Sequence, residues 1–111
     1  LHQCGINILD IYICPHHWDD NCYCRKPKPG LFFEASKKYL LRLDQTLFIG
    51  DDPRDCLAAK NAGCNSIFIG NAEKLKSLTK EEQPIHVSLT LTESIHSIIS
   101  FFEKIPNLKI L

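Results

Sequence analysis

Four candidate metal ligands lie within eleven residues of the sequence, and this cluster restricts the fold more than any other feature. The ligands are three thiols and one imidazole, at Cys14, His16, Cys22 and Cys24. Only five residues separate His16 from Cys22, which is short enough for the chain to fold back on itself. Structural zinc sites use four such ligands in tetrahedral geometry and leave no position open for water. The segment therefore predicts a structural zinc (Zn2+) loop, with unrelated buried or reactive thiols as the alternative.

The cysteine pattern favours a reducing compartment over a disulfide framework. Cys-x-Cys pairs make poor disulfides, whereas they suit one tetrahedral metal ion in a reducing environment. Cys4, Cys56 and Cys64 have no ligand spacing, and free cysteines of this kind are commonly small buried apolar residues. We therefore expect a cytoplasmic protein.

Length and charge exclude several classes of function. The 111 residues form at most one domain, with room for a modest core. Lys and Arg together number 13, as do Asp and Glu, and no basic cluster is longer than residues 25–28. This balance does not indicate binding to nucleic acid or to a membrane surface. No apolar run approaches the roughly 20 residues of a membrane helix, so we expect a small-molecule partner, no nucleic acid and no membrane.

Apolar strand patterns alternate with amphipathic helix patterns along the chain, which is typical of an α/β fold with a mostly parallel sheet. Pro29-Gly30 precedes a helix, Pro53 suits the first turn of another, and Gly63 suits its end. The expected strands cover residues 8–13, 46–49, 66–70 and 85–89, and the expected helices cover residues 31–40, 53–62 and 94–104.

The first residues have the pattern expected at the end of a helix. Leu1 to Ile6 has the pattern of a helix tail, with Gly5 at a left-handed stop, and the sequence contains no methionine. We therefore expect residues 1–111 to be a single incomplete domain of a longer protein.

Two polar groups follow expected strands, where parallel sheets bind ligands. Arg25 and Lys26 come directly after the last metal ligand, and a guanidinium and an ammonium there would bind phosphate, although such a pair is often only solvated surface. Asp51, Asp52 and Asp55 follow Gly50. Such acids can cap a helix, and they can also hold a hard cation such as magnesium.

These motifs together resemble the zinc-containing phosphatases of the haloacid dehalogenase superfamily. The resemblance rests on Cys-Pro-His-His, Cys-x-Cys-Arg-Lys-Pro-Lys-Pro-Gly and Gly-Asp-x-x-x-Asp, and it covers residues 1–70. It is greatest for the D-glycero-D-manno-heptose 1,7-bisphosphate 7-phosphatases, with the histidinol-phosphate phosphatases close behind. It implies a Rossmann-like sheet, a sugar-phosphate substrate, structural zinc, catalytic magnesium (Mg2+) and a role in lipopolysaccharide precursor biosynthesis.

Residue roles follow from the same resemblance. Lys26 matches the lysine that stabilises the phosphoryl group, and Arg25 matches a substrate contact. Asp51 matches the magnesium-binding aspartate, and Asp55 its supporting acid. Asp52 stands where the heptose enzymes can carry a lysine. The zinc ligands correspond to Cys14, His16, Cys22 and Cys24.

One motif of the haloacid dehalogenase superfamily has no counterpart in this sequence. Its first strand ends in Asp-x-Asp-Gly-Thr, which supplies the nucleophile and the general acid, and its second carries a phosphate-binding hydroxyl. The sequence contains no Asp-x-Asp. We therefore expect a sheet that lacks the first two strands, and no useful hydrolysis by these 111 residues alone. The alternatives are a histidinol-phosphate phosphatase, a non-catalytic zinc module and, least favoured, a redox protein that uses its Cys-x-Cys pair.

Overall fold

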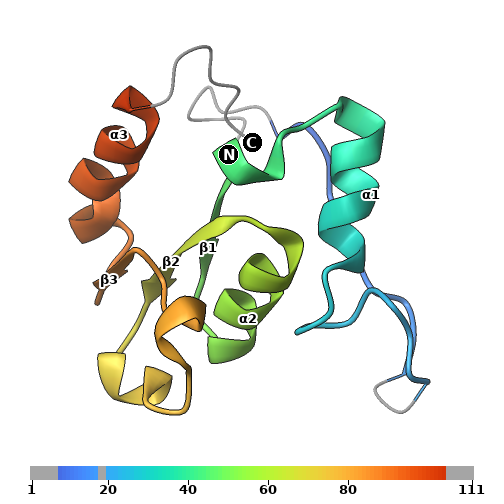
Figure 1. The fold of residues 1–111 in the computed structure, drawn as a ribbon, viewed down its shortest axis with the longest axis horizontal. Helices are drawn as coiled ribbons and strands as arrows, with labels where there is room; N and C mark the ends of the chain where they lie inside the picture. Colours follow the sequence, from blue (N-terminus) through green and yellow to red (C-terminus); the bar gives the residue numbers. More distant parts are fainter. Residues whose placement is uncertain (1–7, 18–19, 105–111) are drawn as a thin grey trace.

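A three-stranded parallel sheet forms the centre of the molecule (Figure 1). The computed structural model describes residues 8–17 and 20–104. The strands are β1 (Leu47–Gly50), β2 (Asn65–Ile69) and β3 (His86–Ser88), in the order β1-β2-β3. Ile49 pairs with Ile67, and Ile67 with His86. The predicted α/β class and three of the predicted strands are confirmed, with β3 at one edge of the sheet.

Three α-helices accompany the sheet in the described part of the chain. They are α1 (Gly30–Tyr39), α2 (Pro53–Ala62) and α3 (Ile95–Glu103), and they match the predicted helices within a few residues. Helix α2 packs against β1 and β2, while α1 lies on the far side of α2 from β3 (Figure 1). Short 3-10 turns cover Leu43–Gln45, Ala72–Leu75, Lys80–Glu82 and Thr92–Ser94.

The core lies between α2 and β2. Ala58 and Ala59 of the helix and Ile67 and Phe68 of the strand are fully buried. Cys56 joins Phe68 and Leu75 in the same apolar cluster, as predicted for a cysteine without ligand spacing. Burial of small alanine side chains lets the helix approach the sheet closely, and α2 therefore fixes the loop that follows β1.

The prediction of a strand at residues 8–13 was wrong. These residues are described as irregular, and Ile8, Leu9, Ile11 and Ile13 are each half or more exposed. A strand exists only when another strand satisfies its backbone N–H and C=O groups, and no described strand lies alongside this segment. The β-branched pattern alone could not supply that partner. The predicted helix tail at Leu1 to Ile6 and the position of Cys4 lie outside the described residues.

The segment at residues 8–13 is attached to α1 by one carboxylate. Asp10 accepts hydrogen bonds from Lys38 Nζ at 2.9 Å and from the Tyr39 hydroxyl at 2.7 Å. These interactions hold the pKa of Asp10 well below its usual range, with the Tyr39 hydrogen bond the largest cause. The attachment places Cys14 beside α1 and leaves the other edge of β1 without a strand among the described residues.

None of the helices in the described ranges has the length and hydropathy needed to cross a membrane.

Candidate functional site

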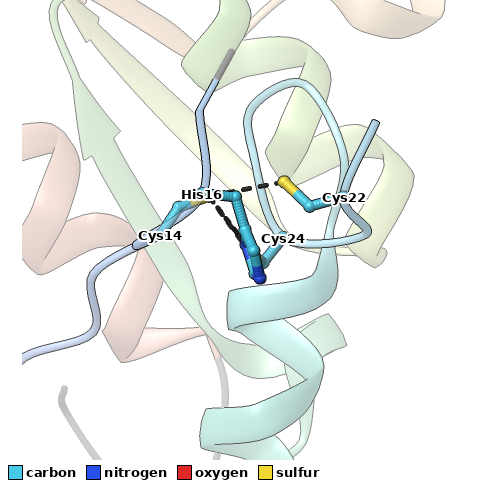
Figure 2. Close-up of side chains that lie close together, drawn as sticks. All are labelled: Cys14, His16, Cys22 and Cys24. Carbon is cyan, nitrogen blue, oxygen red and sulfur yellow. Dashed lines mark hydrogen bonds between the residues drawn. The ribbon is translucent and has the colours of Figure 1, made fainter. Parts of the chain in front are cut away.

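The four predicted metal ligands come together in space, as Figure 2 shows. Cys14 Sγ lies 3.4 Å from Cys22 Sγ and 3.2 Å from Cys24 Sγ, and His16 Nδ1 lies 3.2 Å from Cys24 Sγ. All four ligand atoms are within 4.8 Å of one another. Ligands around a tetrahedral metal with bonds of about 2.3 Å to sulfur are separated by about 3.8 Å. The cluster therefore has the dimensions of a four-coordinate metal site.

The thiols of this cluster shift one another's pKa values. Partial burial raises the pKa of Cys22, but hydrogen bonds with Cys14 and from backbone amides outweigh that effect and lower it to about 6. Burial, together with hydrogen bonds to Cys14 and Cys22, raises the pKa of Cys24 to about 12. One thiolate therefore opposes the formation of the next. A metal cation would remove this opposition, because its charge compensates several thiolates at once.

Glycine at position 30 lets the loop that carries the four candidate metal ligands, called the metal loop below, pack against the start of α1. The Gly30 N–H donates to the Tyr23 carbonyl at 3.1 Å. A Cβ at Gly30 would lie 2.5 Å from that carbonyl oxygen and 2.8 Å from Cys24 Cα. Any larger residue would therefore push the loop away. The buried Cys24 and the residues that follow it are held against the helix by this contact.

Lys26 reaches from the metal loop to the loop that follows β1. Its Nζ lies 2.5 Å from Asp55 Oδ1, and only 3% of Asp55 is exposed. The second carboxylate oxygen of Asp55 accepts hydrogen bonds from the backbone N–H groups of Asp51 at 3.1 Å and Asp52 at 3.0 Å. Asp55 therefore joins the predicted phosphate-binding lysine to the predicted magnesium loop. The sequence indicated both residues but not their contact.

Gly50 makes room for this carboxylate. A Cβ on Gly50 would lie 2.5 Å from Asp55 Cγ and would also contact its Oδ2 and Cβ. From the sequence, Gly50 was only the residue before the aspartates, and the structure was needed to show that its missing side chain leaves space for Asp55. Asp51 itself is exposed, and its carboxylate makes no hydrogen bond or ion pair within the described part of the chain. It is therefore available to a ligand.

A cavity of about 740 Å³ lies beside this arrangement. Much of its wall is apolar and includes Leu31 and Phe32 of α1 and Phe48 of β1. Its charged lining residues are all cationic: Arg25, Lys26, Lys28 and Arg54. The prediction placed Arg25 and Lys26 at a ligand site but missed Arg54, whose position three residues after Asp51 was the only available signal.

A family model described as HAD-hydrolase-like matches residues 23–94. A D-glycero-β-D-manno-heptose-1,7-bisphosphate 7-phosphatase of Helicobacter pylori is 38% identical over 77 residues, which are 69% of this chain and 44% of that protein. The histidine biosynthesis bifunctional protein HisB of Campylobacter jejuni is 41% identical over 70 residues, which are 63% of this chain and 20% of that protein. The chain therefore spans less than half the length of these relatives.

One solved structure resembles the fold closely. It is the D,D-heptose 1,7-bisphosphate phosphatase of B. bronchiseptica, complexed with magnesium and phosphate. The TM-score is 0.76 at 30% sequence identity, and the match covers 89% of this chain and 56% of that protein.

Proposed function

Because the chain belongs to the HAD-hydrolase-like family, we propose that Arg25, Lys26 and the loop at Asp51 are parts of a phosphatase site. The proposed reaction is hydrolysis of a sugar-phosphate monoester, with D-glycero-D-manno-heptose 1,7-bisphosphate as substrate. The observation that carries this proposal is the contact of Lys26 with Asp55, which fixes an ammonium group beside the backbone of Asp51. Fixed positive charge at a phosphoryl group is the main way in which proteins promote phosphoryl transfer.

Lys26 and Arg25 would bind the phosphate. Lys26 keeps 45% of its side chain exposed despite the Asp55 contact, so its ammonium can still reach an anion in the cavity. Arg25 offers a planar fork of N–H donors that matches two phosphate oxygens. Asp55 would act by positioning Lys26 and the Asp51 loop.

Asp51 would hold magnesium. Its exposed carboxylate is the hard oxygen ligand that this cation prefers. When bound, magnesium would neutralise negative charge on a phosphate group. Asp55 is occupied by Lys26 and two amides, so its part in the magnesium site would be support of the Asp51 loop.

The metal of the cysteine loop would be structural zinc. Three thiolates and one imidazole fill a tetrahedral shell and leave no position for a reacting water. Metal-bound thiolates suit a reducing compartment, and a cytoplasmic location is therefore part of this proposal.

A second candidate is a histidinol-phosphate phosphatase, which the similarity to HisB of Campylobacter jejuni favours. Both candidates need the same phosphate-binding residues. A non-catalytic zinc module needs none of them. Hydrolysis in this family is attributed to an Asp-x-Asp motif, which the 111 residues do not contain, so we expect phosphate binding by this chain without useful turnover.

Phosphate binding by the purified 111-residue protein tests the proposal. Inorganic phosphate is titrated with magnesium present, and binding is measured by calorimetry. Lys26→Met is expected to weaken binding about tenfold, the typical cost of one charge-assisted hydrogen bond. Lys37→Met, which removes an exposed lysine of α1 outside the cavity, is the matched control. Equal affinity of wild type and Lys26→Met would contradict the proposed site, as would hydrolysis that survives Asp51→Asn and Lys26→Met.

A further inference from the structure

Lys26 lies in a tight turn of the metal loop. The Lys28 N–H donates to the Arg25 carbonyl at 2.8 Å, which closes the turn with Lys26 and Pro27 at its two central positions. A lysine side chain is a flexible four-carbon stem, so the turn by itself does not fix the ammonium group. The place of this ammonium therefore depends on the contacts that hold the turn and the side chain.

Helix α2 holds the turn at two points. Near the start of the helix, Asp55 Oδ1 accepts from Lys26 Nζ at 2.5 Å. Near its end, Asn61 Nδ2 donates to the Pro27 carbonyl at 2.9 Å. The two helix residues are six positions apart, which is about 9 Å along the axis. One contact is with the side chain of the lysine and the other is with the backbone of the turn, so together they restrain both ends of the lysine.

Asn61 makes its contact from an exposed position of α2. The Pro27 carbonyl is 34 residues away along the chain, so the hydrogen bond is a tertiary contact and not a local cap of the helix. Asn61 does not line the cavity, so its amide lies outside the proposed phosphate position. Asparagine also has a lower helix propensity than alanine, so α2 by itself gives no reason for this residue. An effect of Asn61 on phosphate binding would have to pass through the turn.

We propose that Asn61 is a positioning residue for the phosphate-binding lysine, which acts by holding the Pro27 carbonyl. This inference rests on the proposed function, because Lys26 is taken to bind the phosphate. The Lys26 side chain is 45% exposed, so its contact with Asp55 leaves it freedom to move. Without the Asn61 amide, the turn would add its own freedom, and ordering the ammonium at a phosphate would cost more entropy.

The phosphate affinity of the 111-residue protein tests this role. Inorganic phosphate is titrated with magnesium present, and binding is measured by calorimetry. Asn61→Ala is expected to weaken binding about threefold to fivefold, the typical effect of one neutral hydrogen bond, and by less than Lys26→Met does. Asn61→Gln keeps an amide donor and should recover part of the loss. Asn71→Ala is the matched control, because Asn71 Oδ1 also makes a 2.9 Å hydrogen bond with the backbone, from the Glu73 N–H, but away from this turn.

Two further measurements separate positioning from folding. The higher helix propensity of alanine offsets the lost hydrogen bond, so the stability of Asn61→Ala in urea should stay close to that of wild type. In a Lys26→Met background, Asn61→Ala should weaken phosphate binding less than it does in wild type, because the ammonium that it positions is gone.

Wild-type phosphate affinity in Asn61→Ala would overturn the positioning role, as would an absence of recovery in Asn61→Gln. An equal loss from Asn61→Ala in wild type and in the Lys26→Met background would also overturn it. These results leave the proposed function intact as long as Lys26→Met weakens binding by itself. Equal affinities of wild type and Lys26→Met would contradict the proposed function, and the positioning role with it.

Discussion

Asp55 is the residue on which the geometry of the candidate site depends. Its buried carboxylate accepts from Lys26 and from the backbone N–H groups of Asp51 and Asp52. A buried carboxylate is tolerated only when such partners compensate its lost hydration. The family resemblance implied a supporting role for Asp55. It could not identify Lys26 as its partner, because 29 residues separate them.

Gly50→Ala should damage this site through steric overlap. The added Cβ would overlap the Asp55 carboxylate, which has backbone on its other side. We expect a loss of about 1–3 kcal/mol in the free energy of unfolding, typical of overpacking, and weaker binding of inorganic phosphate.

Gly63→Ala is the control for this substitution. Gly63 has φ 83° and open space around it, so alanine there should cost about 1–2 kcal/mol through backbone strain alone. Urea denaturation and phosphate titration compare the two variants. Phosphate affinity should fall in Gly50→Ala and stay unchanged in Gly63→Ala. Equal phosphate affinities of the two variants would show that Asp55 needs no space at Gly50.

Helix α2 is the element whose limits the sequence predicted best. Asp52 is its N-cap and accepts from the Arg54 N–H at 2.8 Å, Pro53 occupies the first turn, and Gly63 ends it in the left-handed conformation. These signals act within a few residues, so they do not depend on the rest of the fold. The same local cap positions the backbone of the Asp51 loop.

The N-cap of α2 should make stability depend on pH in acid. Hydrogen bonds from the Arg54 guanidinium and its N–H lower the pKa of Asp52 from 3.8 to about 2. A lowered pKa means that the charged carboxylate stabilises the folded state above pH 3.8, and that this contribution is lost as pH falls towards 2. Asp52→Ala should cost about 1 kcal/mol at pH 7.

Asp52→Asn separates capping from charge. Asparagine caps nearly as well as aspartate but cannot titrate, so this variant should lose less stability than wild type between pH 4 and pH 2. Thermal unfolding followed by circular dichroism at several pH values measures the difference. Identical acid profiles of wild type and Asp52→Asn would contradict a stabilising charge at this cap.

At the scale of the whole molecule, few side-chain contacts join the metal loop and α1 to α2 and the sheet. Besides the Lys26–Asp55 pair, Asn61 Nδ2 donates to the Pro27 carbonyl at 2.9 Å, and the rings of Phe32 and Phe48 meet edge to face at 4.8 Å. Around them lie the cavity and the exposed apolar side chains of residues 8–13. A metal ion at the candidate ligands would therefore stabilise this loop more than a core of its own does.

Removal of the metal should loosen this part of the molecule and leave the sheet intact. After treatment with a chelator, amide hydrogen exchange at residues 14–28 is expected to accelerate by about tenfold or more, because local opening no longer breaks metal bonds. Amides of β1 and β2 should keep their protection. Cys22→Ser should reproduce the effect, whereas Cys64→Ser, outside the cluster, should not. Unchanged exchange in the chelated protein would show that the loop holds its shape without metal.

The sequence by itself determined the features that depend on neighbours along the chain. These are the cluster of candidate metal ligands, the caps of α2, and the apolar strands at β1 and β2. A ligand spacing, a cap or a short buried run is complete within a dozen residues. Only the tertiary structure decided that residues 8–13 are irregular and that Asp55 binds Lys26 in the space at Gly50. A strand needs a partner strand, and a buried carboxylate needs donors, and both come from distant parts of a chain.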